Sequence, residues 1–167
     1  YGEGTGISYP VVQGSNNEFY LSHMPDQTYN QSGSIFMDCR NTDRSGSSNE
    51  ILYGHHMKNG SMFAGLKKYA SQDYYEAHNS FYYLTEHQNY RLEILRAGVT
   101  TDASDVYQIA FQSAQEKEDC TDRWNKKSCI TSMFQEKTDA ALMTLSTCSY
   151  ETLDARFVVQ GQLIGMN

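Results

Sequence analysis

The sequence predicts a mainly β fold, and two features of its composition support that class. The 167 residues include thirteen tyrosines and seven phenylalanines, with Thr, Val and Ile in short runs, and these residue types are enriched in strands. Only two prolines are present, and stretches with the helical spacing of apolar residues are short. At this length we expect one domain, residues 1–167, with helices at its periphery.

Several stretches are predicted as strands because apolar and β-branched residues run together between turn-forming residues. Pro10 indicates a strand start or a sheet edge, since proline has no backbone N–H to give to a ladder. A hairpin at residues 86–89 is the natural join between two of these stretches. The predicted strands are residues 7–13, 33–38, 50–53, 81–85, 90–100, 141–148 and 156–164.

Helices are predicted in patches only. The spacing of Met62, Phe63, Leu66 and Tyr69 indicates an amphipathic helix over residues 62–70, capped near Asn59 or Ser61. Shorter helical pieces are predicted at 17–23 and at 71–78, the second with Ser71 as its cap. Residues 101–139 form a long polar insertion, with one helix predicted at 114–127 and another at 130–136.

The charge of the chain limits the classes of partner that it is expected to bind. The net charge is −7 and the pI is about 5.1, which argues against nucleic acid or an anionic membrane surface, because no basic stripe is visible. A peptide or protein partner is the expectation. No run of 18 apolar residues is present, and the first residue is Tyr1 rather than Met, which fits a lost N-terminal anchor.

The cysteines leave the redox state open. Cys120 and Cys129 lie nine residues apart in a polar stretch and could form a disulfide or remain free, while Cys39 stands alone. No CxxC or HxxxH spacing occurs, so we expect no metal, and nothing in the sequence calls for a cofactor.

Cys148 is the candidate nucleophile. It ends an apolar, threonine-rich strand, where a substrate could reach its sulfur; the alternative is a buried cysteine acting as a small hydrophobic residue. Arg156 begins the next predicted strand of the same hairpin, so the two residues can be neighbours across the ladder. A guanidinium there could bind peptide carbonyls or a developing oxyanion; the alternative is a surface arginine paired with Glu151 or Asp154.

A histidine is available at the rim of the sheet. His55 and His56 follow the strand that ends at Gly54, and adjacent residues at a strand end point in opposite directions. Only one of them should therefore face Cys148, and spacing does not choose between them. The other histidines, His23, His78 and His87, lie in polar contexts typical of solvated surface residues.

With these residues in view, the chain resembles the sortases, cysteine transpeptidases of Gram-positive bacteria, and class B among them. The motif TLxTC is present as Thr144–Cys148, the arginine region as Ala155–Val159 and the histidine region as Tyr53–Phe63. Residues 9–13 and 33–38 are also similar to class B sequences. Cys39 departs from the pattern, which usually has an aromatic residue there, and Cys120 and Cys129 belong to no motif of the family.

The resemblance implies a closed eight-stranded β-barrel with short peripheral helices and a helix in the long connection before the cysteine-bearing strand. It also selects His55, because the catalytic histidine of the family directly follows the glycine. Cys148 would cleave a sorting pentapeptide after its Thr and hold the acyl group as a thioester. His55 would transfer protons and Arg156 would bind the substrate backbone and the oxyanion.

Further roles follow from the same resemblance. Asn17, Leu21, Ser146 and Thr147 would bind the sorting signal. The partners would be surface proteins that carry the signal and an amine of the peptidoglycan cross-bridge or of lipid II. The enzyme would act at the extracellular face of the cell membrane, held there by the missing anchor. Alternatives are a pilin-polymerising sortase, a hydrolytic cysteine peptidase of the same fold and a non-catalytic module that captures peptides.

Overall fold

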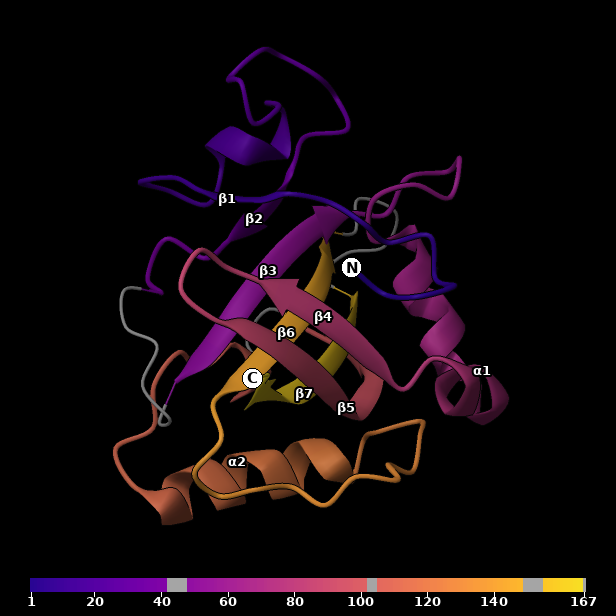
Figure 1. Cartoon of the computed structure of the whole chain (residues 1–167), viewed down its shortest axis with the longest axis vertical. Helices are drawn as coiled ribbons and strands as arrows, with labels where there is room; N and C mark the ends of the chain where they lie inside the picture. The colour runs from indigo at the N-terminus through magenta and orange to yellow at the C-terminus, as the bar shows by residue number, and fades with distance from the viewer. Residues whose placement is uncertain (42–47, 102–104, 149–154, 167) are drawn as a thin grey trace.

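One twisted sheet organises the molecule (Figure 1). A computed structural model describes residues 1–41, 48–101, 105–148 and 155–166. Its seven strands follow the order β1-β2-β3-β6-β7-β5-β4. The strands are β1 (Val11–Gln13), β2 (Ile35–Met37), β3 (Asn49–His55), β4 (Ser80–Leu84), β5 (Asn89–Thr100), β6 (Leu142–Cys148) and β7 (Arg156–Gly165).

The predicted strands are confirmed, with shifts of a few residues at their ends. β4 and β5 form the expected antiparallel hairpin, and β6 pairs antiparallel with β7. The first strand is shorter than predicted, since only Val11–Gln13 pairs with β2. The third extends past Gly54 to His55, because the parallel ladder between β3 and β6 continues to that residue. Residues 149–154, the predicted connection between β6 and β7, lie outside the described residues.

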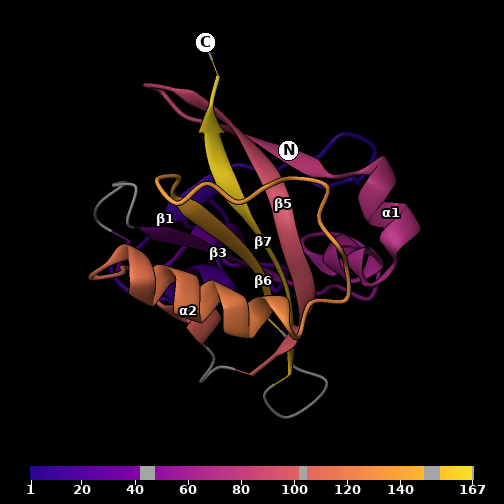
Figure 2. The ribbon, with the colours of Figure 1, turned by 90° about the horizontal axis from the view of Figure 1, so that it is seen from below.

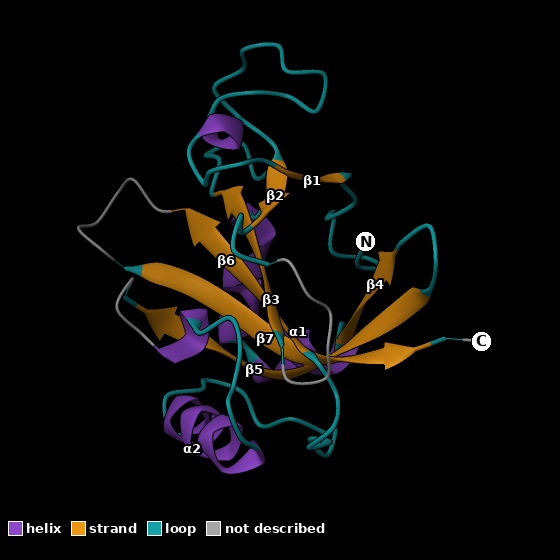
Figure 3. Ribbon diagram, turned by 90° about the vertical axis from the view of Figure 1, so that its left-hand side faces the viewer, coloured by secondary structure: helices purple, strands orange, loops and turns teal. Residues whose placement is uncertain are grey.

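The expectation of a closed eight-stranded barrel is only partly met. Within the described residues, the seven strands form a curled sheet whose end strands, β1 and β4, do not pair with each other (Figure 3). Residues near the N-terminus extend the β4 edge instead. Tyr1 donates its amino group to the carbonyl of Tyr82 at 2.6 Å, and Tyr82 N–H donates to the carbonyl of Tyr1 at 2.7 Å. Pro10, which cannot donate, precedes the short pairing of β1.

The two faces of the sheet bury different cores. The inner face, with Leu52 and Leu145 as cross-strand partners, packs against apolar residues of two short helices. These helices are the 3-10 helix η2 (Ala64–Ala70) and α1 (Gln72–Ala77). The outer face carries Ile51, Tyr53 and Val158, which pack under the 3-10 helix η3 (Asp105–Tyr107) and α2 (Ala114–Asn125). Figure 2 shows α2 and α1 on opposite sides of the sheet.

Helix predictions succeeded where a cap was present. Ser113 and Ser71 accept hydrogen bonds from Glu116 N and Tyr74 N, and they cap α2 and α1. The amphipathic segment 62–70 buries Leu66 and Tyr69 as expected, but it forms the 3-10 helix η2 rather than an α-helix. The piece predicted at 17–23 is the single 3-10 turn η1 (Phe19–Leu21).

The helix predicted at 130–136 was wrong. This segment lies over β5 and α1, and its polar groups bond to those elements and in a local turn, where Phe134 N–H donates to the hydroxyl of Ser132. Ser132 donates its hydroxyl to the carbonyl of Ile94, and Met133 N–H donates to the hydroxyl of Tyr75. Tertiary contacts therefore override the local helical pattern. None of the described helices has the length and apolar character needed to cross a bilayer.

Candidate active site

The register of two parallel strands sets the candidate histidine beside the candidate cysteine. β3 pairs with β6 from Asn49↔Leu142 to His55↔Cys148, without a slip. The residues therefore occupy adjacent positions at the same end of the two strands. His55 is buried, with 5% of its surface exposed. The segments that carry these residues are far apart in sequence, and the parallel ladder is what brings them together.

Arg156 lies on the other side of the cysteine strand. It is half-buried and begins β7, which pairs antiparallel with β6 through Ser146↔Val158. The ladder ends at Ser146↔Val158, two residues short of Arg156 and Cys148, so these two residues lie near the same end of the hairpin. A further hydrogen bond fixes the end of the hairpin, since Phe157 N–H donates to Thr147 Oγ1 at 3.0 Å. β6 therefore runs between the strand with the histidine and the strand with the arginine.

A backbone carbonyl orients the His55 ring. His55 Nε2 lies 2.5 Å from the carbonyl oxygen of Leu21, at the end of η1. A carbonyl oxygen only accepts hydrogen bonds, so Nε2 carries a proton in this arrangement. In the neutral ring the other nitrogen, Nδ1, then carries no proton and is the nitrogen that can accept one. A histidine in an acyl-transfer site is commonly oriented by such a third group, and here a main-chain oxygen supplies it.

Gly54 allows the strand to approach its neighbours closely just before His55. A Cβ atom at this position would lie 2.4 Å from Ile35 Cδ1 and 2.8 Å from two ring atoms of Phe63. Both side chains are buried, so neither can move away easily. His56 follows on the opposite side: it is half-buried, forms a backbone bridge with Met62 and lines a separate hollow with Lys58.

A buried carboxylate holds the segment after β2 against β3, where the N–H of Asp38 donates to the carbonyl of Ile51. Asp38 accepts hydrogen bonds from the guanidinium of Arg40 and from the hydroxyl of Tyr53 at 2.9 Å. Burial by itself would raise the pKa of Asp38. The hydrogen bonds from Arg40, Tyr53 and Asn17 outweigh burial and lower that pKa to about 2. Burial, followed by the charge of Asp38, raises the pKa of Tyr53, which therefore stays protonated.

The four predicted substrate-binding residues divide into two pairs according to how far they are exposed. Asn17 and Leu21 are half-buried; Asn17 Oδ1 accepts from the N–H of Cys39 at 2.7 Å. Ser146 and Thr147 are covered, with 0% and 1% of their surfaces exposed. The covered pair is also engaged in hydrogen bonds within the protein. Ser146 Oγ lies 2.8 Å from a tyrosine hydroxyl, and Thr147 accepts the bond already described.

Sequence reasoning missed three residues of this region: Asp38, Tyr53 and Tyr107. Tyr107 supplies the hydroxyl that bonds to Ser146, and its ring stacks on Tyr53 with centroids 6.3 Å apart. Alternation along the strand before His55 places Tyr53 on the histidine's face, so that residue could have been found from spacing. Tyr107 is brought in by η3 of the long insertion, and no local pattern indicated its contact with β6.

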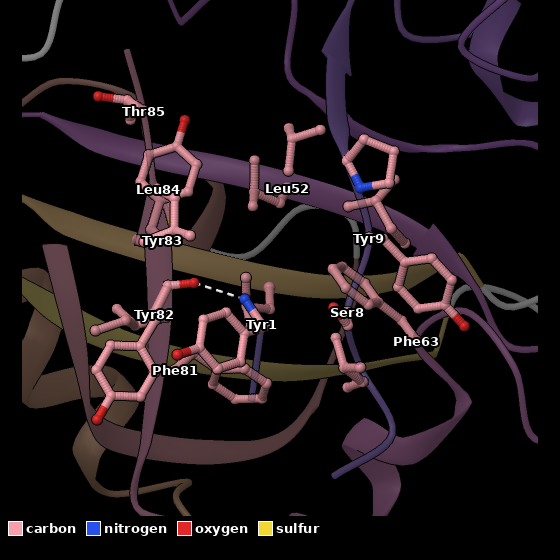
Figure 4. A pocket seen from close by; sticks show the side chains of 17 residues that line it. Tyr1, Ser8, Tyr9, Leu52, Phe63, Phe81, Tyr82, Tyr83, Leu84 and Thr85 are labelled. Carbon is pink, nitrogen blue, oxygen red and sulfur yellow. Dashed lines mark hydrogen bonds between the residues drawn. The ribbon is translucent and has the colours of Figure 1, made fainter. Parts of the chain in front are cut away.

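A further cavity lies away from these residues. It measures about 520 Å³ and opens at the seam between residues 7–11 and β4 (Figure 4). Leu52, Leu92 and Leu145 of the inner sheet face line it, together with tyrosines of β4. No histidine or cysteine is among the described residues around it. Its size therefore does not make it the reaction site, because acyl transfer requires a nucleophile and a base.

Comparison with known proteins identifies the family. A model of the sortase domain matches residues 3–164. The chain belongs to the sortase family. It is 37% identical over 162 residues to sortase B of Listeria monocytogenes, covering 96% of this chain and 66% of that protein. It is 34% identical over 163 residues to sortase B of Staphylococcus aureus, covering 96% and 67%. The chain thus spans about two thirds of the length of these relatives, and its similarity is to class B.

Solved structures agree with this sortase over its whole described fold. The complex of S. aureus sortase B with substrate superposes with a TM-score of 0.94 at 33% identity, covering 100% of this chain and 78% of that one. Sortase B complexed with triglycine gives 0.92 at 33% identity, covering 100% and 79%. Sortase B of L. monocytogenes gives 0.88 at 36% identity, covering 97% and 90%.

Cys39, Cys120 and Cys129 of this sortase are free thiols. Cys120 and Cys129 are not bonded to each other, so the disulfide alternative is wrong for this structure. Burial raises the pKa of both thiols, which disfavours the reactive thiolate. His23 and His78 are also less solvated than expected, because each is half-buried and bonds to a backbone carbonyl; His87 is exposed as predicted.

Proposed function

We propose that this sortase is a cysteine transpeptidase that joins surface proteins to the cell wall at the outer face of the membrane. The observation that carries the proposal is the aligned pair His55↔Cys148, with Arg156 on the next strand. The relatives support the same reaction class. Sortase B structures have been solved with substrate and with triglycine, a short peptide with a free amine.

In the first half-reaction, the Cys148 thiolate attacks the carbonyl carbon of the Thr in the sorting signal. A C–S bond forms and the carbonyl π electrons move to oxygen, giving a tetrahedral oxyanion. The oxyanion then collapses, the C–N bond breaks and His55 donates a proton to the leaving amine. The products are a thioester on Cys148 and the free C-terminal fragment of the signal.

In the second half-reaction, the amine of a peptidoglycan cross-bridge or of lipid II attacks the thioester carbonyl. His55 accepts the proton that this amine loses, and the C–S bond breaks when the second oxyanion collapses. The result is a new amide and a regenerated thiolate. Proton transfer is balanced over the cycle, because His55 donates one proton and recovers one.

Arg156 binds the oxyanion or the carbonyls of the extended signal. Its planar guanidinium offers several N–H donors in a fixed arrangement, and it lies beside the strand end that carries the nucleophile. Asn17 and Leu21 are partly exposed and can contact the signal directly. Ser146 and Thr147 are covered, so in this proposal they support the wall of the signal site from beneath.

The test measures how much of the acyl group is transferred to an amine and how much is released to water as the acid. The protein is incubated with peptides that carry a Thr-containing sorting signal, with and without triglycine, and the products are separated by mass. Transfer predicts that triglycine converts the acid product into the triglycine amide. A hydrolytic peptidase would release the acid at any triglycine concentration, and a peptide-capture module would release neither. Cys148→Ala is the control, and it should yield no product.

A further inference from the structure

The carbonyl of Leu21, which orients the His55 ring, is one of five consecutive carbonyls that each accept a hydrogen bond. They belong to the segment between β1 and β2, which extends away from the sheet in Figure 1. The donors to the carbonyls of residues 19–23 are, in that order, His23 Nδ1 at 2.7 Å, Ser34 N at 2.9 Å, His55 Nε2 at 2.5 Å, Asn30 N at 2.9 Å and Ser34 Oγ at 2.7 Å. The bonds on either side of Leu21 therefore help to fix the position of its carbonyl.

Ser34 supplies two of these five donors. Its N–H donates to the carbonyl of Tyr20, directly before Leu21, and its hydroxyl donates to the carbonyl of His23, two residues after Leu21. Ser34 is buried, with 4% of its surface exposed, and it directly precedes β2. Because β2 pairs with β3, the strand that ends at His55, Ser34 connects both sides of Leu21 to the sheet that carries the histidine.

The chain after Leu21 has little other support. Residues 22–30 form a small hairpin, in which His23 and Tyr29 make an antiparallel bridge. Residues 24–30 are all exposed. An exposed hairpin with few buried contacts opens locally at a low cost in free energy. The hydroxyl of Ser34 bonds at the base of this hairpin, so it limits how far the motion of the hairpin reaches the Leu21 carbonyl.

We propose that Ser34 is a positioning residue for His55, because its hydroxyl keeps the Leu21 carbonyl where it accepts the hydrogen bond from Nε2. This inference rests on the proposed transpeptidase function, in which His55 transfers a proton in both half-reactions. A ring held by Leu21 presents Nδ1 in one direction. A ring that rotates about its side-chain bonds is misdirected for part of the time, which slows both proton transfers. Ser34 acts through Leu21 and contacts no reacting atom.

The alternative role for Ser34 is support of the signal site, because Leu21 is also a proposed contact of the signal. A weakened signal site raises the KM for the signal peptide and leaves kcat unchanged. A misdirected His55 lowers kcat and leaves the KM for both peptides unchanged. Kinetics therefore separate the two roles.

The kinetic test uses Ser34→Ala, which removes the hydroxyl and keeps the N–H bond to Tyr20. It should slow both thioester formation and transfer to triglycine about tenfold, with less than about a twofold change in KM for either peptide. Ser132→Ala is the matched control, because the Ser132 hydroxyl also donates to a backbone carbonyl, that of Ile94 on β5. It should leave both rates unchanged. A raised KM with unchanged kcat, or equal losses of rate in both variants, would overturn the proposal.

A spectroscopic test needs no substrate. The ring N–H of His55 is buried and hydrogen-bonded, so in protein labelled with ¹⁵N it should give a downfield proton signal that exchanges slowly with water. Its absence from His55→Gln assigns the signal. In Ser34→Ala this proton should exchange at least about fivefold faster, and in Ser132→Ala it should exchange at the wild-type rate. Unchanged exchange in Ser34→Ala would overturn the proposal.

The wild-type protein provides a check that does not depend on how a variant folds. The backbone amide of Ser34 should exchange with water more slowly than the amides of residues 24–29, because it is the buried base to which the hairpin is bonded. A Ser34 amide that exchanges as fast as those of the hairpin would show that Ser34 holds nothing in place, and the proposal would be wrong.

The two proposals can fail separately. If the wild-type protein forms no thioester with any signal peptide, the transpeptidase function fails, while exchange of the His55 ring proton still reports on Ser34. If thioester formation and transfer proceed at the same rates in the wild type and in Ser34→Ala, the positioning role alone is wrong.

Discussion

A methyl group added to Gly33 would lie 2.6 Å from the carbonyl oxygen of Leu21, the same oxygen that accepts the hydrogen bond from His55. Gly33 also has a positive φ of 57°, which disfavours any other residue. The chain at this turn therefore determines where the orienting carbonyl sits. The site depends on a residue that has no contact with the substrate in the proposed reaction.

Gly33→Ala should slow thioester formation by about 10²-fold, because the displaced carbonyl no longer holds the His55 ring in place. Gly6→Ala is the control. Gly6 has a similar positive φ of 78° but no atom within 4 Å of the added methyl group, so it should lose stability without slowing the reaction. Single-turnover rates and urea denaturation of both variants check this prediction. Equal rate losses would mean that backbone strain, and not the carbonyl position, is responsible.

Arg156→Lys should reduce kcat by about 10², although the charge is retained, because lysine lacks the planar arrangement of donors that holds an oxyanion. Arg123→Lys is the comparison, since Arg123 is exposed and pairs with Asp105 of η3. It should retain full activity. Steady-state kinetics with a signal peptide and triglycine measure both variants, and full activity of Arg156→Lys would show that a positive charge suffices.

Tyr107→Phe should lower the free energy of unfolding by about 1–2 kcal/mol, because the buried hydroxyl of Ser146 loses its partner at 2.8 Å. Tyr29→Phe removes a hydroxyl from a side chain that is 70% exposed and should change little. Urea denaturation monitored by tryptophan fluorescence gives both values. A Tyr107→Phe protein as stable as the wild type would show that this bond contributes nothing to folding.

Asp38 should make stability depend on pH in the acid range. Its pKa in the folded protein is about 2, below the ordinary 3.8, so its stabilising effect is complete above pH 4 and is lost as the pH falls through 2. Asp38→Asn should therefore be less stable than the wild type at pH 5, with a difference that shrinks toward pH 2. Urea midpoints at several pH values test this, with Glu86→Gln as an exposed control. A constant difference across the range would contradict the assignment.

Local sequence patterns predicted the strands, because each strand forms where its own residues favour a strand. The alternation before Gly54 and the hairpin around residues 86–89 are properties of contiguous sequence. Segments whose conformation depends on distant contacts were mispredicted. Ser132 and Met133 bond to β5 and α1 rather than to a helix of their own, and no sequence period reveals such bonds.

The site was predicted in part, because some of its features depend on local sequence and others on distant contacts. His55, Cys148 and Arg156 each end or begin a strand, so their placement at a sheet rim could be inferred. Which histidine lies opposite the cysteine depends on the register between β3 and β6, and only the resemblance to a family chose it in advance.

The most direct test of the central claim is the intact mass of the protein after incubation with signal peptides. The protein should gain a mass equal to that of the acyl fragment that ends in Thr, mapped by digestion to Cys148 and absent from Cys39, Cys120 and Cys129. Cys148→Ala should show no adduct, and His55→Ala should accumulate little. An adduct on another cysteine, or product formation by Cys148→Ala, would show that Cys148 is not the nucleophile.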